Sequence, residues 1–230
     1  MAVNDGRRVG RPRVDPRPTE KEPREELLDA AAELFSSVGY GNATTRAIAQ
    51  AAGLRQPSLF HYFATKEELF AELLDRTVEP AMALLRRLET LDEPADVRLY
   101  LLVYGDVKNL TAGAYNVPVL QLLPEARRPP FRDFWRKREQ LFAGYLTFVE
   151  RTLADGFGQV DDPERTTRTM FGAVESVATW IDRSEDDPLE VAATVADLLI
   201  GGFVGFRRLA RVQSIAAQLL DAVVLSPADA

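Results

Sequence analysis

Apolar side chains recur at helical spacing along almost the whole chain after residue 23, and this periodicity constrains the fold more than any other feature. Between residues 27 and 38 they fall at relative positions 0, 1, 4, 7, 8 and 11, the stripe that an amphipathic helix turns toward a core. Gly39 is placed to end that helix in a left-handed cap. No stretch alternates apolar and polar residues for long enough to predict a strand. The sequence therefore predicts an all-α fold.

Further helices are expected through the rest of the chain. A long one begins at Thr65, which forms a capping box with Glu68, and Pro80 interrupts its stripe. Asp-Pro pairs at 162–163 and 187–188 are typical of an N-cap followed by proline in the first turn. Other helices are expected near 95–112, 116–123, 130–154, 163–184, 188–208 and 211–224, and the one near 95–112 is apolar nearly all round, which indicates a buried central helix.

Composition excludes several classes of protein. A length of 230 residues suggests one large domain, or a small one joined to a medium one, and 46% of the residues are hydrophobic, enough to form a core. The absence of cysteine and the single histidine, His61, leave few ways to build a metal site or a Ser/His/Asp triad. The N-terminus has no apolar leader, and the most apolar stretch, 191–206, is short and contains Asp197. We therefore expect a soluble, cytoplasmic protein with no metal and no cofactor.

Charge is distributed unevenly along the chain. Residues 71–230 hold 18 basic and 25 acidic side chains and carry the whole net charge of -7, whereas residues 1–70 hold ten of each. Within that neutral part, residues 36–66 contain no Asp or Glu, and residues 6–14 contain four arginines and no acid. An acid-free basic surface on an acidic protein is typical of a region that faces phosphates.

Residues 44–66, TTRAIAQAAGLRQPSLFHYFATK, have the pattern of a helix-turn-helix. Thr45 is expected to cap a short helix, and Ala49 is small where a second helix must cross closely. Gly53 falls at the turn, where a positive φ costs glycine nothing. Pro57 suits the first turn of the second helix. Each special position is filled by a residue type that the motif needs.

With this motif the sequence resembles the TetR family of transcriptional regulators, over about residues 24–75. The resemblance rests on Gly39-Tyr40, Thr44-Thr45, Ile48-Ala49, Ala52-Gly53, Leu59-Phe60, Tyr62-Phe63, Lys66-Glu67 and Leu69. It implies a homodimeric repressor that binds a palindromic DNA operator and leaves it when an unidentified small-molecule effector binds. The implied domains are a basic arm (1–22), a helix-turn-helix head (23–68) and a ligand-binding and dimerisation body (69–226). Phe60 departs from the tyrosine usual in the family, so one phenolic contact to phosphate is missing.

The resemblance also implies DNA contacts, residue by residue. Arg46 suits guanine and Gln56 suits adenine, while Tyr62 and Lys66 resemble clamps on the phosphate backbone. The residues expected at the DNA are Thr45, Arg46, Arg55, Gln56, Pro57, Ser58, His61, Tyr62 and Lys66, with Arg11 and Arg13 of the arm in the minor groove. The alternative is that these are ordinary solvated residues and that the arm is a solubilising tail.

For the body, the resemblance implies a pocket and a dimer interface. The segments 163–184 and 188–208 are expected to pair with a second subunit; the alternative is that they only form the monomer's own core. Aromatic pocket candidates are Tyr100, Tyr104, Phe131, Trp135, Phe142, Phe171 and Trp180. Residues 127–138 hold six basic side chains against Asp133, which suits either an acidic ligand or a solvated connection. The last segment, 211–224, has no assigned role.

Other functions remain open on the sequence alone. One is an architectural DNA-binding protein that needs no effector, and another is a helical adaptor whose head no longer binds DNA. An enzyme is disfavoured, because neither a glycine-rich phosphate loop nor a nucleophile–base pair is present. Within the leading hypothesis, Pro80 is either a hinge between head and body or a plain helix break.

Overall fold

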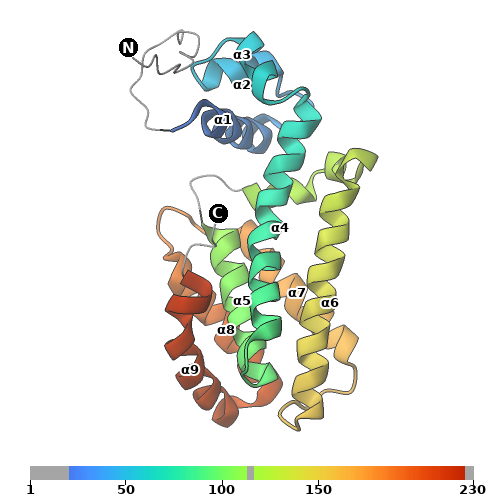
Figure 1. Cartoon of the computed structure of the whole chain (residues 1–230), viewed down its shortest axis with the longest axis vertical. Coiled ribbons are helices and arrows are strands. Elements are labelled where there is room, and N and C mark those ends of the chain that lie inside the picture. The colour runs from blue at the N-terminus through green and yellow to red at the C-terminus, as the bar shows by residue number, and fades with distance from the viewer. Residues whose placement is uncertain (1–20, 113–116, 226–230) are drawn as a thin grey trace, which may run out of the picture. The chain divides into compact units, whose positions relative to one another are not determined.

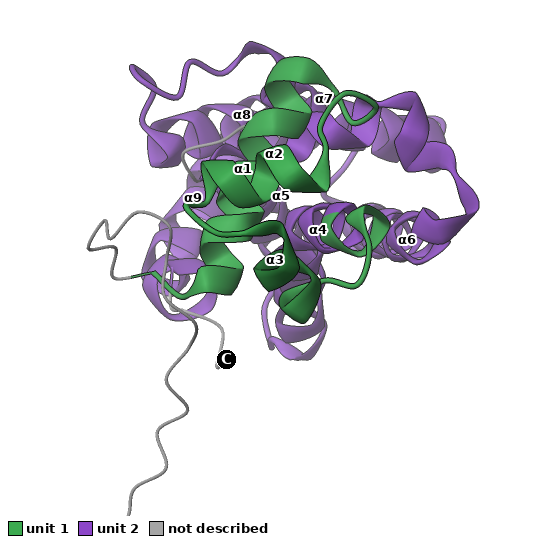
Figure 2. Cartoon of the chain, turned by 90° about the horizontal axis from the view of Figure 1, so that it is seen from above, with its two compact units in different colours: residues 1–69 green, residues 70–230 purple. Residues whose placement is uncertain are grey.

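The computed structural model describes residues 21–112 and 117–225, in which every regular element is helical and no strand occurs (Figure 1). The all-α prediction is therefore confirmed. The chain divides into two compact units, residues 1–69 and 70–230, which Figure 2 colours separately. Arg11, Arg13 and all but the last two residues of the predicted arm lie outside the described residues. Over those described ranges, no helix is both long and apolar enough to cross a membrane.

Unit 1 is a small bundle built on the stripe of its first helix. Its elements are α1 (Pro23–Val38), α2 (Thr45–Ala51), α3 (Gln56–Tyr62) and the first turn of α4 (Lys66–Thr90). The predicted stripe of α1 is buried from Leu27 to Phe35, apart from the half-buried Leu34, whereas its last member, Val38, is 46% exposed. Gly39 follows α1 with a φ of 82° and a ψ of 157°. It thus provides the positive φ that was expected, in an extended rather than a left-handed helical conformation.

Unit 2 is organised around one buried helix. Its elements are the rest of α4, α5 (Ala95–Thr111), η1 (Val117–Leu122), η2 (Pro124–Arg127), η3 (Pro129–Phe131), α6 (Arg132–Ala154), α7 (Pro163–Trp180), α8 (Pro188–Val204), α9 (Phe206–Leu220) and the π-helical turn η4 (Asp221–Leu225). Helix α5 packs against α6, α7, α8 and α9 (Figure 1). Residues 99–107 are all buried. The prediction of a central helix is confirmed.

Two glycines let α4 approach its neighbours closely. A Cβ added at Gly105 of α5 would overlap the side chain of Leu84, and one at Gly144 of α6 would overlap Leu85. Both leucines lie on α4 and are almost fully buried. The second half of α4 is therefore seated against both helices with no room for larger residues.

Buried polar pairs tie α9 to the core of unit 2. The carboxylate of Asp96 on α5, which is fully buried, accepts hydrogen bonds from Nε (2.5 Å) and Nη2 (3.1 Å) of Arg208. The guanidinium of Arg208 also lies 3.5 Å from the ring centre of Phe157. Such a pair is stable only because each buried charge has its partner.

Prolines shorten two of the predicted helices. The range 116–123 was expected to be α-helical, but the structure has the 3-10 helix η1 instead. The range 130–154 was expected to start at 130, but α6 starts at Arg132. The intervening turns each begin at or next to a proline, namely Pro118, Pro124, Pro129 and Pro130. Each proline fixes its own φ and disfavours a helical conformation in the residue before it, and four prolines within 13 residues therefore divide the segment into short turns.

Three other helix boundaries differ from the prediction, and the local backbone geometry explains them. The helix expected over 163–184 ends at Trp180, because Ile181 is extended, with a ψ of 133°. The helix expected over 188–208 ends at Val204, because Gly205 takes a φ of 81°; α9 then starts five residues before the expected 211. Pro80 was expected to interrupt α4, but it lies inside a continuous helix.

Candidate nucleic-acid interface and the cavities of unit 2

The turn between α2 and α3 is held by a positive φ and by backbone hydrogen bonds. Gly53 has a φ of 68°, as the sequence predicted. Its amide donates to the carbonyl of Gln50 (3.0 Å), and the amide of Leu54 donates to that of Ala49 (2.8 Å). Ala49 and Leu59 are fully buried where the two helices meet. The residues of this motif thus fix the angle at which α3 leaves the turn.

The N-cap of α2 is Thr44, not Thr45 as expected. Thr44 has an extended backbone, and its hydroxyl accepts a hydrogen bond from the amide of Ala47 at 3.1 Å, whereas Thr45 is already helical. The Thr45 hydroxyl instead accepts a hydrogen bond from the amide nitrogen of Gln56 at 2.9 Å. This bond joins α2 to α3 and orients the side chain that was expected to read adenine.

The predicted DNA contacts divide into two groups by exposure. Exposed residues are Arg46, Arg55, Pro57, His61 and Tyr62, whereas Thr45, Gln56 and Ser58 are half-buried. His61 and Tyr62 meet edge to face, with ring centres 5.3 Å apart. Phe60 beside them is 49% exposed. Because residues 36–66 contain no acid, the exposed face of α3 and the start of α2 present arginine and aromatic groups without a competing carboxylate.

Lys66 is placed differently from the expected phosphate clamp. Its ammonium donates to the backbone carbonyls of Tyr40 (2.8 Å) and Ala43 (3.0 Å), and it lies 4.1 Å from the ring centre of Tyr40. Lys66 therefore holds the loop after α1 against the first turn of α4. This role could not be predicted from the sequence, because the partners are backbone atoms more than 20 residues away.

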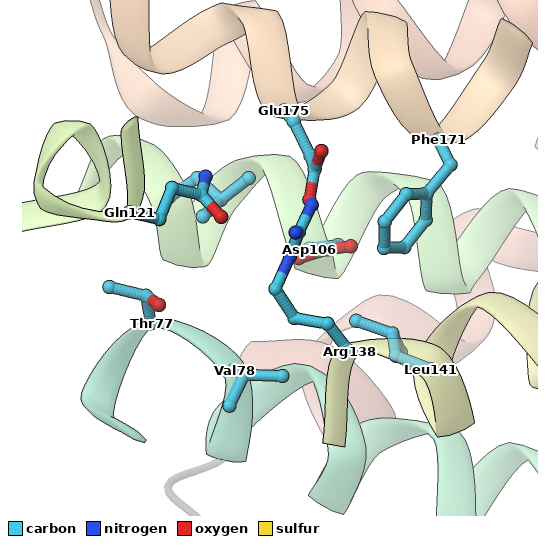
Figure 3. A pocket seen from close by; sticks show the side chains of 9 residues that line it. Thr77, Val78, Asp106, Gln121, Arg138, Leu141, Phe171 and Glu175 are labelled. Carbon is cyan, nitrogen blue, oxygen red and sulfur yellow. The ribbon is translucent and has the colours of Figure 1, made fainter. Parts of the chain in front are cut away.

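Unit 2 contains two neighbouring cavities that share three residues. The smaller, of about 20 Å³, reaches the buried Asp106 and the ring of Phe171 (Figure 3). The larger, of about 230 Å³, reaches Trp135 and Arg127. Gln121, Arg138 and Glu175 line both. The guanidinium of Arg138 forms an ion pair with the carboxylate of Glu175, and Figure 3 shows the two side chains meeting end to end. This pair therefore borders both cavities.

Two of the seven aromatic pocket candidates line these cavities, namely Trp135 and Phe171. Tyr100, Tyr104, Phe131, Phe142 and Trp180 line neither cavity. Of these, Tyr100 donates to Asp197 (3.0 Å), Phe131 packs on Phe70, and Trp180 is 54% exposed. Burial, followed by the hydrogen bond to Asp197, raises the pKa of Tyr100.

Burial shifts the pKa values of two charged groups that line the smaller cavity. It raises the pKa of Asp106 to about 6, although the hydroxyl of Tyr145, which donates at 2.8 Å, and the charge of Arg138 both lower it. Burial also lowers the pKa of Arg138 to about 10, the charge of Arg127 adding to this effect and that of Asp106 opposing it. Asp106 and Glu175 were not among the residues predicted from the sequence. An acid in the middle of the mostly apolar range 97–110 was the available signal for Asp106.

Helices α7 and α8 leave a face uncovered within the described chain. Thr194, Leu198 and Gly202 are exposed at intervals of four residues along α8, and Leu198 is 66% exposed. On α7, Gly172 is likewise exposed, and a Cβ added to it or to Gly202 would meet no atom within 4 Å. A second helix could thus approach α8 closely at Gly202, whereas Gly172 borders the larger cavity.

Comparison with known proteins supports a relationship over both units. Residues 27–73 match the family model described as "Bacterial regulatory proteins, tetR family". The chain is 30% identical over 196 residues to the uncharacterized HTH-type transcriptional regulator YdgC of Bacillus subtilis, covering 80% of this chain and 93% of that protein. The fatty acid metabolism regulator protein of the same bacterium is 27% identical over 189 residues, covering 77% and 93%. The crystal structure of Mycobacterium smegmatis AmtR matches with a TM-score of 0.78 at 36% identity, covering 90% of this chain and 98% of that one.

Proposed function

The chain belongs to the TetR family of bacterial regulatory proteins, and from this premise we propose that it is a homodimeric repressor released from its operator by an effector bound in unit 2. It is a DNA-binding transcriptional regulator, as its relatives are. The observation that carries the proposal is the helix-turn-helix of unit 1, whose second helix exposes basic and aromatic side chains on an acid-free segment.

In the proposed complex α3 lies in the major groove. Arg46 offers a guanidinium fork to guanine, and Gln56, oriented by its bond to Thr45, offers its amide to adenine. Tyr62 contacts the phosphate backbone, which sets the register without reading the sequence. The arm adds Arg11 and Arg13 in the minor groove, an element of the proposal that lies outside the described residues.

The proposed dimer forms through the uncovered face of α7 and α8. Two heads related by a two-fold axis bind half-sites one helical turn apart, about 34–36 Å from centre to centre. An effector that favours a different head separation lowers the affinity for DNA. The effector can lower the affinity for DNA only to the extent that it binds the other conformation more tightly than the DNA-binding one. We propose that the protein binds and releases its operator and its effector without catalysing a reaction. We propose that it does so in the cytoplasm, where the operator lies.

The test is selection of fragments from genomic DNA by the purified full-length protein. The expected result is enrichment of fragments that share an inverted repeat and are retained by the protein with a steep dependence on salt concentration. Failure to retain any double-stranded fragment at low ionic strength, after bound metabolites have been removed, contradicts the proposal. Unselective retention of all fragments would favour the architectural DNA-binding protein instead.

A further inference from the structure

We infer that the effector is a small monocyclic acid whose carboxylate binds Arg138 in the larger cavity and takes the place of Glu175. This inference rests on the proposed function, because it names the chemical class of the molecule that occupies unit 2. It is carried by three features of the described residues: a mostly buried guanidinium, an internal carboxylate already bound to it, and a fixed indole ring beside both.

Arg138 is a cation held in an aromatic surround. Its side chain is 16% exposed, and its guanidinium lies 4.8 Å, 5.5 Å and 5.9 Å from the ring centres of Trp135, Phe171 and Phe134. A guanidinium with so little water around it needs an anionic partner, and its planar fork matches a carboxylate. In this structure Glu175 supplies that carboxylate.

Glu175 can be exchanged for a carboxylate from outside without leaving Arg138 unpaired. The pair lies at the border of the larger cavity, so an incoming acid reaches the same guanidinium that Glu175 occupies. Arg127 lines that cavity as well, giving it two arginines against one carboxylate. This surplus positive charge compensates for the negative charge that the ligand adds. Asp106 lines only the smaller cavity and keeps its bond to Tyr145.

The volume of the larger cavity suits a ligand with one ring, and Trp135 lies at its edge. The indole nitrogen donates to the carbonyl of Ala126 at 2.6 Å, and the guanidinium of Arg127 lies 3.5 Å from the ring centre. The ring is therefore held in place next to the guanidinium groups of both Arg127 and Arg138. A cavity of about 150 Å³ holds benzene, so the observed volume of about 230 Å³ admits one six-membered ring with a short acidic substituent.

Tryptophan fluorescence tests the inference directly. The chain has two tryptophans, so the full-length variant Trp180→Phe keeps Trp135 as its single indole. This variant is titrated with benzoate, 4-hydroxybenzoate and phenylacetate, and separately with the corresponding neutral amides. We expect a saturable change in fluorescence with at least one acid, and binding of its amide that is weaker by about 10-fold or more.

Three further variants, each in the Trp180→Phe background, separate recognition by Arg138 from a general effect on structure. Arg138→Gln is expected to weaken binding of the acid by about 10- to 100-fold. Arg136→Gln is the matched control, because that side chain is 60% exposed and pairs with Asp133 on the same helix. Glu175→Gln is expected to tighten binding, because it removes the internal competitor. This gain is a readout that a merely structural role would not produce, and it remains measurable should Arg138→Gln fail to fold.

The inference is overturned if no acid changes the Trp135 signal, if acids and amides bind equally, or if Glu175→Gln weakens binding. The same protein is assayed in parallel on the fragments selected from genomic DNA. A protein that binds those fragments but none of the acids contradicts the ligand class alone. A protein that binds an acid but no DNA contradicts the repressor proposal and leaves the carboxylate site standing.

Discussion

At the scale of single residues, Lys66, which is predicted to contact a DNA phosphate, also forms hydrogen bonds inside unit 1. Its ammonium satisfies two loop carbonyls of unit 1. Replacing it with methionine should cost about 1–3 kcal/mol of local stability, the usual contribution of hydrogen bonds to a charged group. Amide hydrogen exchange in residues 39–48 should accelerate by about 10-fold or more. Lys21→Met is the control, since its ion pair with Asp29 is largely exposed. Equal exchange in both variants would return Lys66 to the predicted phosphate contact.

Arg46 is still predicted to contact a base, so its replacement is expected to change the sequence specificity of DNA binding. Arg46→Ala should cost about 1–3 kcal/mol of operator binding and should relax the preference at one base pair of each half-site. Binding to operator variants substituted at each position in turn measures this. Arg151→Ala, an exposed arginine of unit 2, is the control and should leave the preferences unchanged. A loss of the same size on every sequence would make Arg46 a phosphate contact.

Asp106 predicts a pH dependence of stability. Its pKa is raised from 3.8 to about 6, so between these values the folded state holds a proton that the unfolded state releases. Stability conferred by the protonated acid is therefore lost as pH rises from about 4 to 6. Asparagine does not ionise, so the Asp106→Asn variant does not lose this stability as pH rises. Its side-chain oxygen can still accept the hydrogen bond from the Tyr145 hydroxyl. Its stability relative to the parent should rise by about 2–3 kcal/mol between pH 4 and 7.

Unfolding followed by tryptophan fluorescence measures this difference, because both tryptophans lie in unit 2. The control is Asp133→Asn, since that side chain is 80% exposed and should show no such trend. Parallel pH profiles for the parent and Asp106→Asn would contradict the raised pKa.

At the scale of elements, features that depend on residues close together in the sequence could be predicted, whereas contacts between distant segments could not. The stripe of α1, the turn at Gly53 and the Asp-Pro starts of α7 and α8 were all predicted and are confirmed, because each depends on residues a few positions apart. The break at Gly205 was missed, because glycine at a helix end and glycine at a close packing contact look alike in sequence. The pairing of Arg138 with Glu175 was also missed, because it depends on how α6 and α7 pack together.

The attachment of α9 gives a prediction for an element. Arg208→Ala leaves the carboxylate of Asp96 buried without its partner, and should destabilise unit 2 by about 3–5 kcal/mol. Urea unfolding followed by tryptophan fluorescence measures this loss. Arg207→Ala changes an exposed neighbour on the same helix and should have a small effect. If Asp96→Asn does not restore part of the stability in the Arg208→Ala background, the buried charge is not the cause.

At the scale of the whole molecule, the prediction concerns assembly. Leu198 is the most exposed large apolar side chain on α8, at the centre of the proposed dimer face. Leu198→Asp should weaken the dimer by about 2 kcal/mol or more, because it places a charge in a packed apolar contact. Sedimentation equilibrium measures the change. Val38→Asp alters a comparably apolar exposed residue of unit 1, 46% exposed, and should leave the oligomeric state intact. If the Leu198→Asp variant dimerises as tightly as the parent, the interface does not include this face of α8.

The internal bonds of Lys66 have a mechanical consequence. Lys66 is the first residue of α4, and it grips the loop that follows α1. Within unit 1, the first turn of α4 and the loop after α1 are therefore held together. In the proposed repressor, a rotation of that first turn would carry the loop with it, so the three short helices of unit 1 would shift on their half-site as a single body.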